Sequence, residues 1–350
     1  MTALTPSPAP PRMRTALGSE PKPRIWALLS DHAGDNAQAL ALAEAIGLPF
    51  ETKTLRYTWL KRLPRNNARV SLLSIDRASR EQLAPPWPQL IIMVGPRSQP
   101  VGRYVKRLSG GRTKLVLIGR PRARPDAFDL IFDTRQYLLP DAANIRVLPL
   151  AMSRRRDPVR PTEEERAWLD SLPRPHLLLM IGGPIRYWDV SPDHVVAVVS
   201  KLLERARQAG GSVIVTGSPR TPPTVLRRVS EELAAATNAR VAPGMARFEA
   251  LIDDADELFP PGDSVSMISE SVITGKPVGI VPVRQTLWGR IVLGPESRMK
   301  WTPLRDLRRF WTYLREQRLA GSIDEPIACK ICSPVVTGAE RVRELLQASD

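Results

Sequence analysis

Gly262-Asp-Ser-Val-Ser-Met-Ile-Ser-Glu-Ser-Val-Ile-Thr-Gly-Lys-Pro-Val-Gly-Ile-Val-Pro282 is the most strongly patterned stretch of the sequence. Small hydroxyl residues open an apolar segment, and Ser264 and Ser266 are typical of the first positions of a helix, where a hydroxyl caps free backbone N–H groups. Gly275-Lys-Pro then predicts the end of that helix, and Val278–Val281 reads as a buried strand. The stretch therefore predicts a loop, a helix and a strand of the kind that builds parallel α/β sheets.

The same alternation of short apolar runs and helical segments continues on both sides of this stretch. Near-continuous apolar strands separated by helices are typical of a parallel sheet that is covered on both faces. Strands are expected at 24–30, 90–94, 115–118, 130–132, 177–181, 213–215 and 278–281, and helices at 37–46, 101–108, 191–208 and 224–236.

The length of the chain indicates two such units. A chain of 350 residues is longer than one ordinary core needs, and the basic, proline-marked stretch 153–161 interrupts the α/β pattern. We expect two Rossmann-like parallel-sheet domains that face each other across a cleft. The expected division is a disordered proline-rich leader at 1–23, an N-terminal α/β domain at 24–157, a C-terminal α/β domain at 158–320, and a segment at 321–350 that packs back on the N-terminal domain.

The charge of the chain is uneven. Of the formal +15, residues 1–150 carry 23 Lys and Arg against 11 Asp and Glu, a net +12, while the other 200 residues carry only +3. A basic half predicts a polyanionic neighbour, which could be nucleic acid, an anionic membrane surface or a phosphorylated substrate; arginines on solvated faces are the simpler reading. The basic stretch 97–124 contains a single aromatic residue, Tyr104, and so lacks the set of interleaved aromatics that base stacking needs; we therefore do not expect nucleic-acid binding.

Other features bear on where the protein works and what it needs. No run of about 18 apolar residues occurs, and the leader has no apolar core of a secretory signal, so we expect a cytoplasmic protein with peripheral contact at the inner membrane face. Cys329 and Cys332 form one Cys-x-x-Cys pair near the C-terminus, and we expect reduced, structural thiols there. We expect no metal and no bound cofactor.

Ligands of open α/β sheets bind at the carboxyl ends of the strands, where loops lead into helix N-termini that suit phosphate. Neither a Walker A motif nor Gly-x-Gly-x-x-Gly is present. Glu270 follows Ser266 by four residues and so shares its helix face. A carboxylate there can hold two hydroxyls of a ribose; otherwise it is solvated or paired with Lys276. The predicted nucleotide-binding and phosphate-binding residues are Gly182, Gly183, Arg186, Thr216, Ser218, Arg220, Ser264, Ser266, Met267 and Glu270.

Several of these motifs, taken in order, resemble the family named for mitochondrial fission, the elongated-mitochondria proteins of plants and bacteria. The resemblance covers roughly residues 24–320 and fits a bacterial member. Its pieces are Ser30-Asp-His-Ala-Gly-Asp-Asn-Ala-Gln38, Gly182-Gly183, Val215-Thr-Gly-Ser218, Arg220-Thr-Pro222, Asp263-Ser-Val-Ser-Met-Ile-Ser-Glu270 and Thr274-Gly-Lys-Pro-Val278. The resemblance implies the GT-B architecture of glycosyltransferases, with a nucleotide or nucleotide-sugar cleft. Glu270 would hold the ribose, and Ser264, Ser266 and the Met267 backbone would face the diphosphate. Asp133-Thr-Arg135 departs from the family, because it lacks the histidine–aspartate pair expected at that strand end.

Two functions follow from this resemblance. One is an inverting, metal-independent glycosyltransferase that uses a nucleotide-sugar as co-substrate and acts on a membrane-associated or anionic acceptor. Such a reaction needs a base, for which His32 and Asp31 are the candidates, and the acceptor side is expected to include Gly34, Asp35, Asn36 and Arg97. The other is a non-catalytic adaptor that recruits protein partners, not identifiable from the sequence, at a membrane surface.

Overall fold

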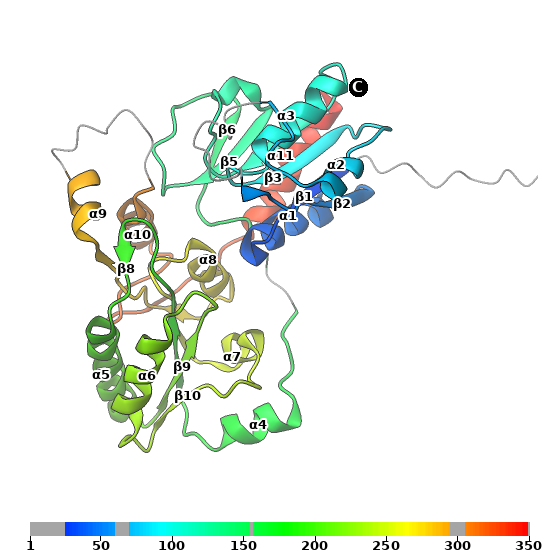
Figure 1. The fold of residues 1–350 in the computed structure, drawn as a ribbon. Helices are drawn as coiled ribbons and strands as arrows, with labels where there is room; N and C mark the ends of the chain where they lie inside the picture. Colours follow the sequence, from blue (N-terminus) through cyan, green and yellow to red (C-terminus); the bar gives the residue numbers. More distant parts are fainter. Residues whose placement is uncertain (1–24, 60–69, 155–156, 295–304, 349–350) are drawn as a thin grey trace, which may run out of the picture.

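The chain forms two α/β halves, each built on its own sheet (Figure 1). The computed structural model describes residues 25–59, 70–154, 157–294 and 305–348. The expected leader at 1–23 lies outside these ranges. The two Rossmann-like halves face each other, and their arrangement is GT-B-like.

The sheet of the N-terminal half has six strands in the order β2-β1-β3-β4-β5-β6, all parallel. Successive residues of β1 point to opposite faces: Ile25 and Ala27 pack with α1 and α11, whereas Trp26 and Leu28 pack with α3. Both faces of the central strands are therefore buried, which explains why strands such as β1, β3 and β4 are apolar without alternation. The elements are β1 (Ile25–Leu29), α1 (Ala33–Ile46), β2 (Phe50–Thr54), α2 (Arg77–Glu81), β3 (Leu90–Val94), α3 (Gln99–Leu108), β4 (Lys114–Ile118), the short 3-10 helix η3 (Pro125–Ala127), β5 (Leu130–Thr134) and β6 (Ile145–Leu148).

The sheet of the C-terminal half follows the order β10-β9-β7-β11-β12-β14, parallel except for the edge strand β14. Strand β7 is buried along its whole length: Leu177 and Leu179 pack with α5 and α6, and Leu178 and Met180 pack with α8 and α10. Its elements are α4 (Glu163–Asp170), β7 (His176–Ile181), α5 (Pro192–Ala209), β9 (Ser212–Gly217), α6 (Pro223–Leu233), β10 (Ala239–Val241), α7 (Phe248–Asp254), β11 (Glu257–Phe259), α8 (Val265–Ile273), β12 (Pro277–Val278), α10 (Leu307–Glu316) and β14 (Ile327–Ala328).

A second, two-stranded sheet and one short helix lie at the side of the C-terminal half. Strand β8 (Trp188–Asp189) pairs antiparallel with β13 (Arg284–Gln285), and α9 (Leu287–Val292) follows directly. The Thr286 backbone N–H donates to the Tyr187 carbonyl at 3.0 Å, which ties α9 to the loop that follows β7.

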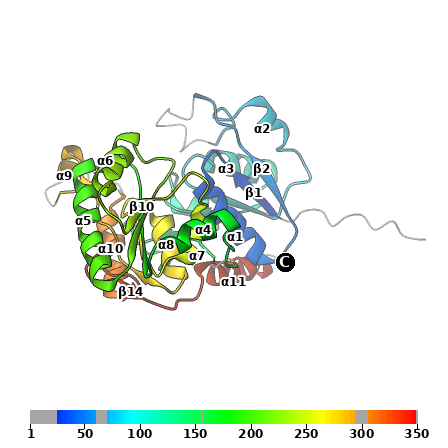
Figure 2. The same ribbon diagram turned by 90° about the horizontal axis from the view of Figure 1, so that it is seen from below.

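The chain passes between the halves twice. After β6, Leu150 and Ala151 enter the core of the C-terminal half, where the Ala151 backbone N–H donates to Ser269 Oγ at 2.9 Å. After β14, the chain returns as α11 (Pro334–Gln347), which lies along α1 of the N-terminal half (Figures 1 and 2). Ser333 Oγ donates to the Ser153 carbonyl at 2.9 Å, so the two crossings run side by side.

Each sheet has one point where the strand order reverses, and such points are where ligands bind in open α/β sheets. In the N-terminal half it lies between β1 and β3, and in the C-terminal half between β7 and β11. The loops after these four strands carry the residues of the site described next.

Candidate functional site

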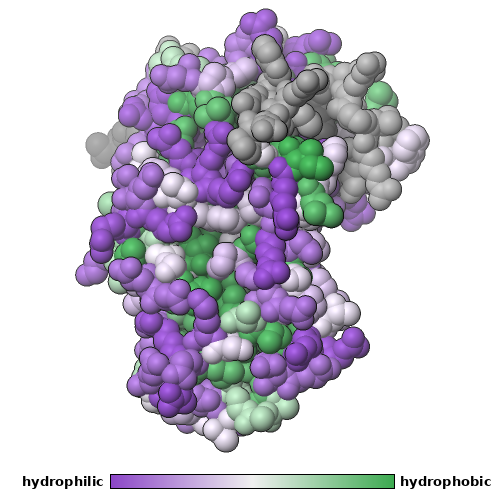
Figure 3. All heavy atoms as spheres, turned by 90° about the vertical axis from the view of Figure 1, so that its left-hand side faces the viewer, coloured by the Kyte–Doolittle hydropathy of each residue, from purple (hydrophilic) through white to green (hydrophobic). Residues whose placement is uncertain are grey.

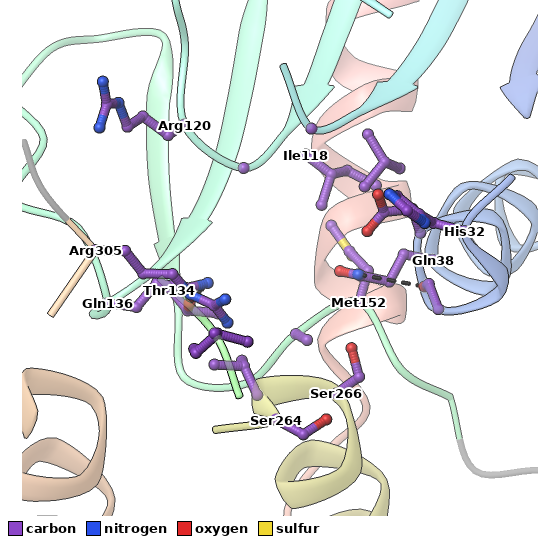
Figure 4. A pocket seen from close by; sticks show the side chains of 18 of the residues that line it. His32, Gln38, Ile118, Arg120, Thr134, Gln136, Met152, Ser264, Ser266 and Arg305 are labelled. Carbon is purple, nitrogen blue, oxygen red and sulfur yellow. Dashed lines mark hydrogen bonds between the residues drawn. The ribbon is translucent and has the colours of Figure 1, made fainter. Parts of the chain in front are cut away.

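A cleft of about 950 Å³ lies between the two halves and is lined by loops from both. Its walls come from the carboxyl ends of β1, β3, β4 and β5 on one side and from the loops after β7, β9 and β11 on the other. The first turns of α1 and α8 both reach it, with Ser266 on α8 facing the α1 side (Figure 4). A β-carbon placed on Gly34 would lie 3.7 Å from Ser266 Oγ, so the two helix starts approach each other closely.

His32 and Asp31 lie at the cleft wall, and both bind Arg97. Arg97 Nη1 donates to Asp31 Oδ1 at 3.2 Å and contacts His32 Nε2 at 2.9 Å. A guanidinium only donates hydrogen bonds, so Nε2 accepts, and the proton of a neutral His32 ring stands on Nδ1. The nitrogen that would take a proton from a substrate is thus already occupied by Arg97.

The rest of the first loop divides between the cleft and the scaffold. Asn36 clamps the loop, since its Oδ1 accepts from the Ser30 N–H at 2.8 Å and its Nδ2 donates to the Ser30 carbonyl at 2.9 Å. Asp35 lines the cleft in the first turn of α1. Burial raises the pKa of the Asp35 carboxyl, while the neighbouring His32, Arg97 and Arg305 act in the opposite direction.

Gly182 and Gly183 shape the turn after β7 by allowing protein groups, not open space, to approach. A β-carbon on Gly182 would overlap Asp263 Oδ1, and one on Gly183 would overlap the Arg220 carbonyl oxygen. Asp263 is fully buried and binds Arg220 Nη2 at 2.9 Å and the Gly183 N–H at 3.3 Å. These contacts fix Arg220 at the cleft edge, where its side chain remains 44% exposed.

The loop after β9 is held by one hydroxyl. Thr221 Oγ1 donates to the carbonyls of Ile181 and Gly182 at 2.7 and 2.9 Å and accepts from the Ser218 N–H at 2.8 Å. Ser218 lines the cleft as a result. Thr216 lies one step back in β9 and is not part of the cleft wall.

Ser264 both caps helix α8 and lines the cleft. Ser264 Oγ accepts from the Met267 N–H at 3.4 Å and so caps α8, while Ser264, Ser266, Met267 and Glu270 all line the cleft. The ammonium group of Lys276 binds the end of α7 rather than the Glu270 carboxylate. Its Nζ donates to the carbonyls of Ile252, Asp253 and Ala255 at 2.9, 2.6 and 2.5 Å, at the end of α7.

Five arginines line the cleft within the described ranges: Arg120, Arg122, Arg186, Arg220 and Arg305. The sequence analysis predicted Arg186 and Arg220 but missed the other three. Burial, and then the nearby charges of Arg122 and Arg186, lower the pKa of Arg120. Arg120 and Arg122 lie in the basic stretch 97–124 just after β4, a position that could have identified them.

Arg305 and Gln136 connect the halves at the end of β5. Arg305 Nε donates to Gln136 Oε1 at 2.6 Å, and Gln136 Nε2 donates to Thr134 Oγ1 at 2.8 Å (Figure 4). The Asp306 N–H also donates to the Gln136 carbonyl at 2.9 Å. Asp133 lines the same wall and is 4% exposed. Nothing local in the sequence placed Arg305 opposite β5, because it belongs to the other half.

One Asp-x-Asp motif, Asp254-Ala-Asp256, does occur in the chain, although we expected no metal-binding motif. Its carboxylates are bound by Arg174 and His176: Arg174 pairs with both, and His176 Nδ1 lies 2.6 Å from Asp254 Oδ2. These residues lie at the amino end of β7, opposite the cleft.

The cleft therefore collects most of the predicted residues but not all. Asp31, His32, Gly34, Asp35, Arg186, Ser218, Arg220, Ser264, Ser266, Met267 and Glu270 line it. Asn36, Arg97, Gly182, Gly183 and Thr216 do not line it, although all except Thr216 make contacts that position the loops around it. In the described part of the chain, no helix is long and apolar enough to cross a membrane.

Comparison with known proteins places this geometry in context. The family model described as "Mitochondrial fission ELM1" matches residues 33–298. A curated relative, "Mitochondrial fission protein ELM1" of Arabidopsis thaliana, is 24% identical over 287 residues, which are 71% of this chain and 67% of the relative.

Solved structures similar to this chain include two enzymes of one kind. A structure of putative UDP-N-acetylglucosamine 2-epimerase from Listeria monocytogenes has a TM-score of 0.53 at 12% identity and covers 93% of this chain and 95% of its own. A UDP-GlcNAc 2-epimerase from Neisseria meningitidis, bound to UDP-GlcNAc, has a TM-score of 0.51 at 10% identity and covers 93% and 99%. At such identities the similarity shows the fold alone.

Proposed function

Since this chain belongs to the mitochondrial fission ELM1 family, we propose that it binds a nucleotide or nucleotide-sugar in the cleft between its two sheets. The observation that carries the proposal is the cluster of five arginines from both halves around a cleft that two helix N-termini also reach. A diphosphate is the ligand that such a cluster suits, because guanidinium groups and free helix N–H groups both bind phosphate oxygens. The UDP-GlcNAc in the similarly folded Neisseria protein supports the same class of ligand.

The diphosphate lies at Ser264–Met267 in this proposal, with Arg220, Ser218 and Arg186 around it. Arg220 is the best placed of these, since Asp263 fixes its orientation before any ligand arrives. Glu270, one turn further along α8, takes the ribose hydroxyls. Both halves contribute to ligand binding in this proposal. Arg120 and Arg122 line the cleft from the N-terminal half, and Arg305 lines it from the segment before α10.

The reaction we propose is glycosyl transfer of the inverting, metal-independent type, with the nucleotide-sugar as co-substrate. The arginines would stabilise the negative charge that develops on the departing diphosphate. The acceptor side is then the wall formed by Gly34, Asp35 and their neighbours on α1. The place of work in this proposal is the cytoplasm.

Ligand binding is tested by thermal shift and native mass spectrometry with UDP-, GDP- and CDP-sugars on the full chain. We expect one nucleotide class to stabilise the protein and Glu270→Ala to weaken that binding at least tenfold. The matched control is Glu316→Ala, which removes an exposed carboxylate on α10 far from the cleft lining and should bind like the wild type. If none of the nucleotide-sugars binds, the proposal fails and the adaptor function is favoured.

A membrane-surface role is favoured by one further observation. Leu287, Trp288 and Ile291 of α9 are 76%, 56% and 66% exposed and share one side of the helix. On the face shown in Figure 3, apolar atoms form patches within a mostly hydrophilic surface, and α9 lies on this side of the molecule. Exposed tryptophan and aliphatic residues beside exposed Arg284 and Arg290 are a combination that binds anionic lipid interfaces.

Liposome flotation separates this role from a purely soluble one. We expect stronger binding to vesicles with anionic lipid than to neutral vesicles, and a loss of binding in Leu287→Ser/Ile291→Ser. The control is Leu73→Ser, which removes an exposed leucine elsewhere on the surface. Equal binding to both kinds of vesicle, or none to either, would contradict the membrane role.

A further inference from the structure

Asp133 is a residue of the cleft wall whose buried carboxylate lacks a partner at normal hydrogen-bond geometry. It stands near the carboxyl end of β5, is 4% exposed, and lines the cleft wall. Both of its carboxylate oxygens are buried from solvent and neither has a partner at normal hydrogen-bond geometry within the described residues, although the Thr134 backbone amide lies close enough to favour the ionised carboxylate. Buried polar groups are almost always hydrogen-bonded, so a carboxylate left this way needs an explanation.

The polar groups around Asp133 are already used by one another. Arg305 binds Gln136, and Gln136 binds Thr134, so the chain of hydrogen bonds at the end of β5 bypasses the carboxylate. Burial of a lone carboxylate is unfavourable when nothing compensates it. A cleft wall that contains such an unpaired group suits a ligand that brings the missing hydrogen bonds.

The charge state of Asp133 suits a group that exchanges protons. Burial raises the pKa of the Asp133 carboxyl to about 7, while the Thr134 backbone amide and the Arg305 charge act in the opposite direction. Tyr137 is a further titratable group that interacts electrostatically with this carboxylate. Burial raises the pKa of its phenol, so the phenol stays neutral. A carboxyl poised near neutral pH can both hold and accept a proton under working conditions.

We propose that Asp133 binds a hydroxyl-bearing acceptor, such as a sugar ring or another polyol, and takes the proton of the reacting hydroxyl. Two unpaired carboxylate oxygens match two adjacent hydroxyls, each of which donates one hydrogen bond. This assignment rests on the proposed function. It replaces His32 as base, because His32 Nε2 is bound by Arg97 whereas the Asp133 oxygens have no partner at normal hydrogen-bond geometry.

The step balances as follows. The acceptor hydroxyl loses its proton to an Asp133 oxygen as its own oxygen forms a bond to the anomeric carbon of the nucleotide-sugar. The bond from that carbon to the diphosphate breaks, and its electron pair remains on the diphosphate oxygen. Arg305, which lies near the Asp133 carboxylate, favours its ionised form before the transfer.

The test compares Asp133→Asn with the wild type in three measurements on the full chain. Asn has the same shape but cannot accept the proton, so release of nucleoside diphosphate from the bound nucleotide-sugar should fall 100-fold or more. Nucleotide binding by native mass spectrometry should change less than threefold, because the proposed diphosphate site lies on the other wall. The unfolding temperature at about pH 8 should rise, since the variant no longer buries a charge.

A control variant and three other results decide whether the assignment to Asp133 holds. Asp126→Asn, which changes an exposed carboxylate, should behave like the wild type in all three measurements. Unchanged turnover in Asp133→Asn, a lower unfolding temperature, or a larger loss in His32→Gln would overturn the assignment to Asp133 while nucleotide binding persists. Absence of nucleotide binding in the wild type itself overturns the proposed function instead, and this assignment with it.

Discussion

At the scale of single residues, Gly182 shows how tightly the site is built. A β-carbon there would overlap Asp263 Oδ1, a buried atom whose carboxylate is held by Arg220 and the Gly183 N–H. Neither partner can move without breaking the turn after β7. The glycine is therefore required by packing between protein groups, independently of any ligand.

Gly182→Ala should accordingly destabilise the fold by about 1–3 kcal/mol, the usual cost of forcing extra volume into a packed site. Urea unfolding followed by circular dichroism measures this. Gly244→Ala is the control, because a β-carbon on Gly244 meets nothing within 4 Å. Equal midpoints for the two variants would show that the turn can relax and that our reading of the contact is wrong.

The raised pKa of Asp133 leads to a prediction about how the stability of the fold depends on pH. Its folded-state pKa of about 7 lies above the value of about 3.9 for an unfolded chain. Between these two values the folded protein keeps a proton that the unfolded chain releases, so this residue lowers stability as pH rises through that window, by up to about 1.4 kcal/mol per unit. Above about pH 7 the effect is constant.

Asp133→Asn removes this dependence. The stability advantage of the variant over the wild type should therefore grow from about pH 5 to about pH 7 and then level off. Urea unfolding midpoints at several pH values measure it. A difference between the two proteins that does not change with pH would mean that the Asp133 carboxyl titrates normally.

At the scale of elements, Lys276 connects the end of α8 to the end of α7. Its ammonium group donates to three carbonyls of α7 and the residue after it, at the negative end of the helix. Burial lowers the pKa of this amine, while the nearby carboxylates of Asp253, Asp254 and Asp256 act in the opposite direction.

Lys276→Met keeps the aliphatic stem but leaves these carbonyls without a donor, so we expect a loss of about 1–3 kcal/mol. Thermal unfolding provides the measurement. Lys330→Met, at an exposed position, should unfold like the wild type. If both variants unfold at the wild-type temperature, water replaces the ammonium group at no cost.

The elements also show how far the sequence predicts the fold. Long apolar runs such as β3 and β7 were found because burial on both faces leaves no polar residue inside them. Strand β2 was missed because only Lys53 in it is buried, by its stem, so its sequence FETKT reads as surface. Helix α1 starts at Ala33, four residues before the expected start at 37, because the glycine-containing stretch that resembled a loop forms its first turn. That turn lines the cleft.

The site was predictable wherever its residues follow a strand directly. The α8 start and the loop after β1 carry their chemistry in one local stretch, so their position at the carboxyl end of a strand could be deduced. Arg305 and Asp133 could not be paired in this way. One follows α9 in the C-terminal half and the other ends a strand of the N-terminal half, and only the packing of the two halves brings them to the same wall.

At the scale of the whole molecule, α11 completes the N-terminal half. Val335, Ala339, Val342 and Leu346 are buried against α1 together with Leu42 and Ile46. Helix α11, at the end of the described chain, thus packs in the same hydrophobic core as α1, near its beginning.

Val342→Asp should therefore unfold the N-terminal half, at a cost of several kcal/mol, because it buries a charge without a partner. Val336→Asp changes the same helix at a position that is 53% exposed and should have little effect. Limited proteolysis and thermal unfolding compare the two. Similar behaviour of both variants would mean that α11 is dispensable for the N-terminal core.

This return of the chain determines the order in which the protein can be finished during its synthesis. Arg343 donates to the carbonyls of Ala45 and Ile46 at the end of α1, from positions 298 and 297 residues later in the chain. At about 5–20 residues per second, a ribosome needs about 15–60 s to make the residues between them. Throughout that time the side of α1 that packs against α11 has no cover, although its other side can already pack on β1 and β3. The first helix of the described chain is therefore completed in its packing only when the last described helix has been made.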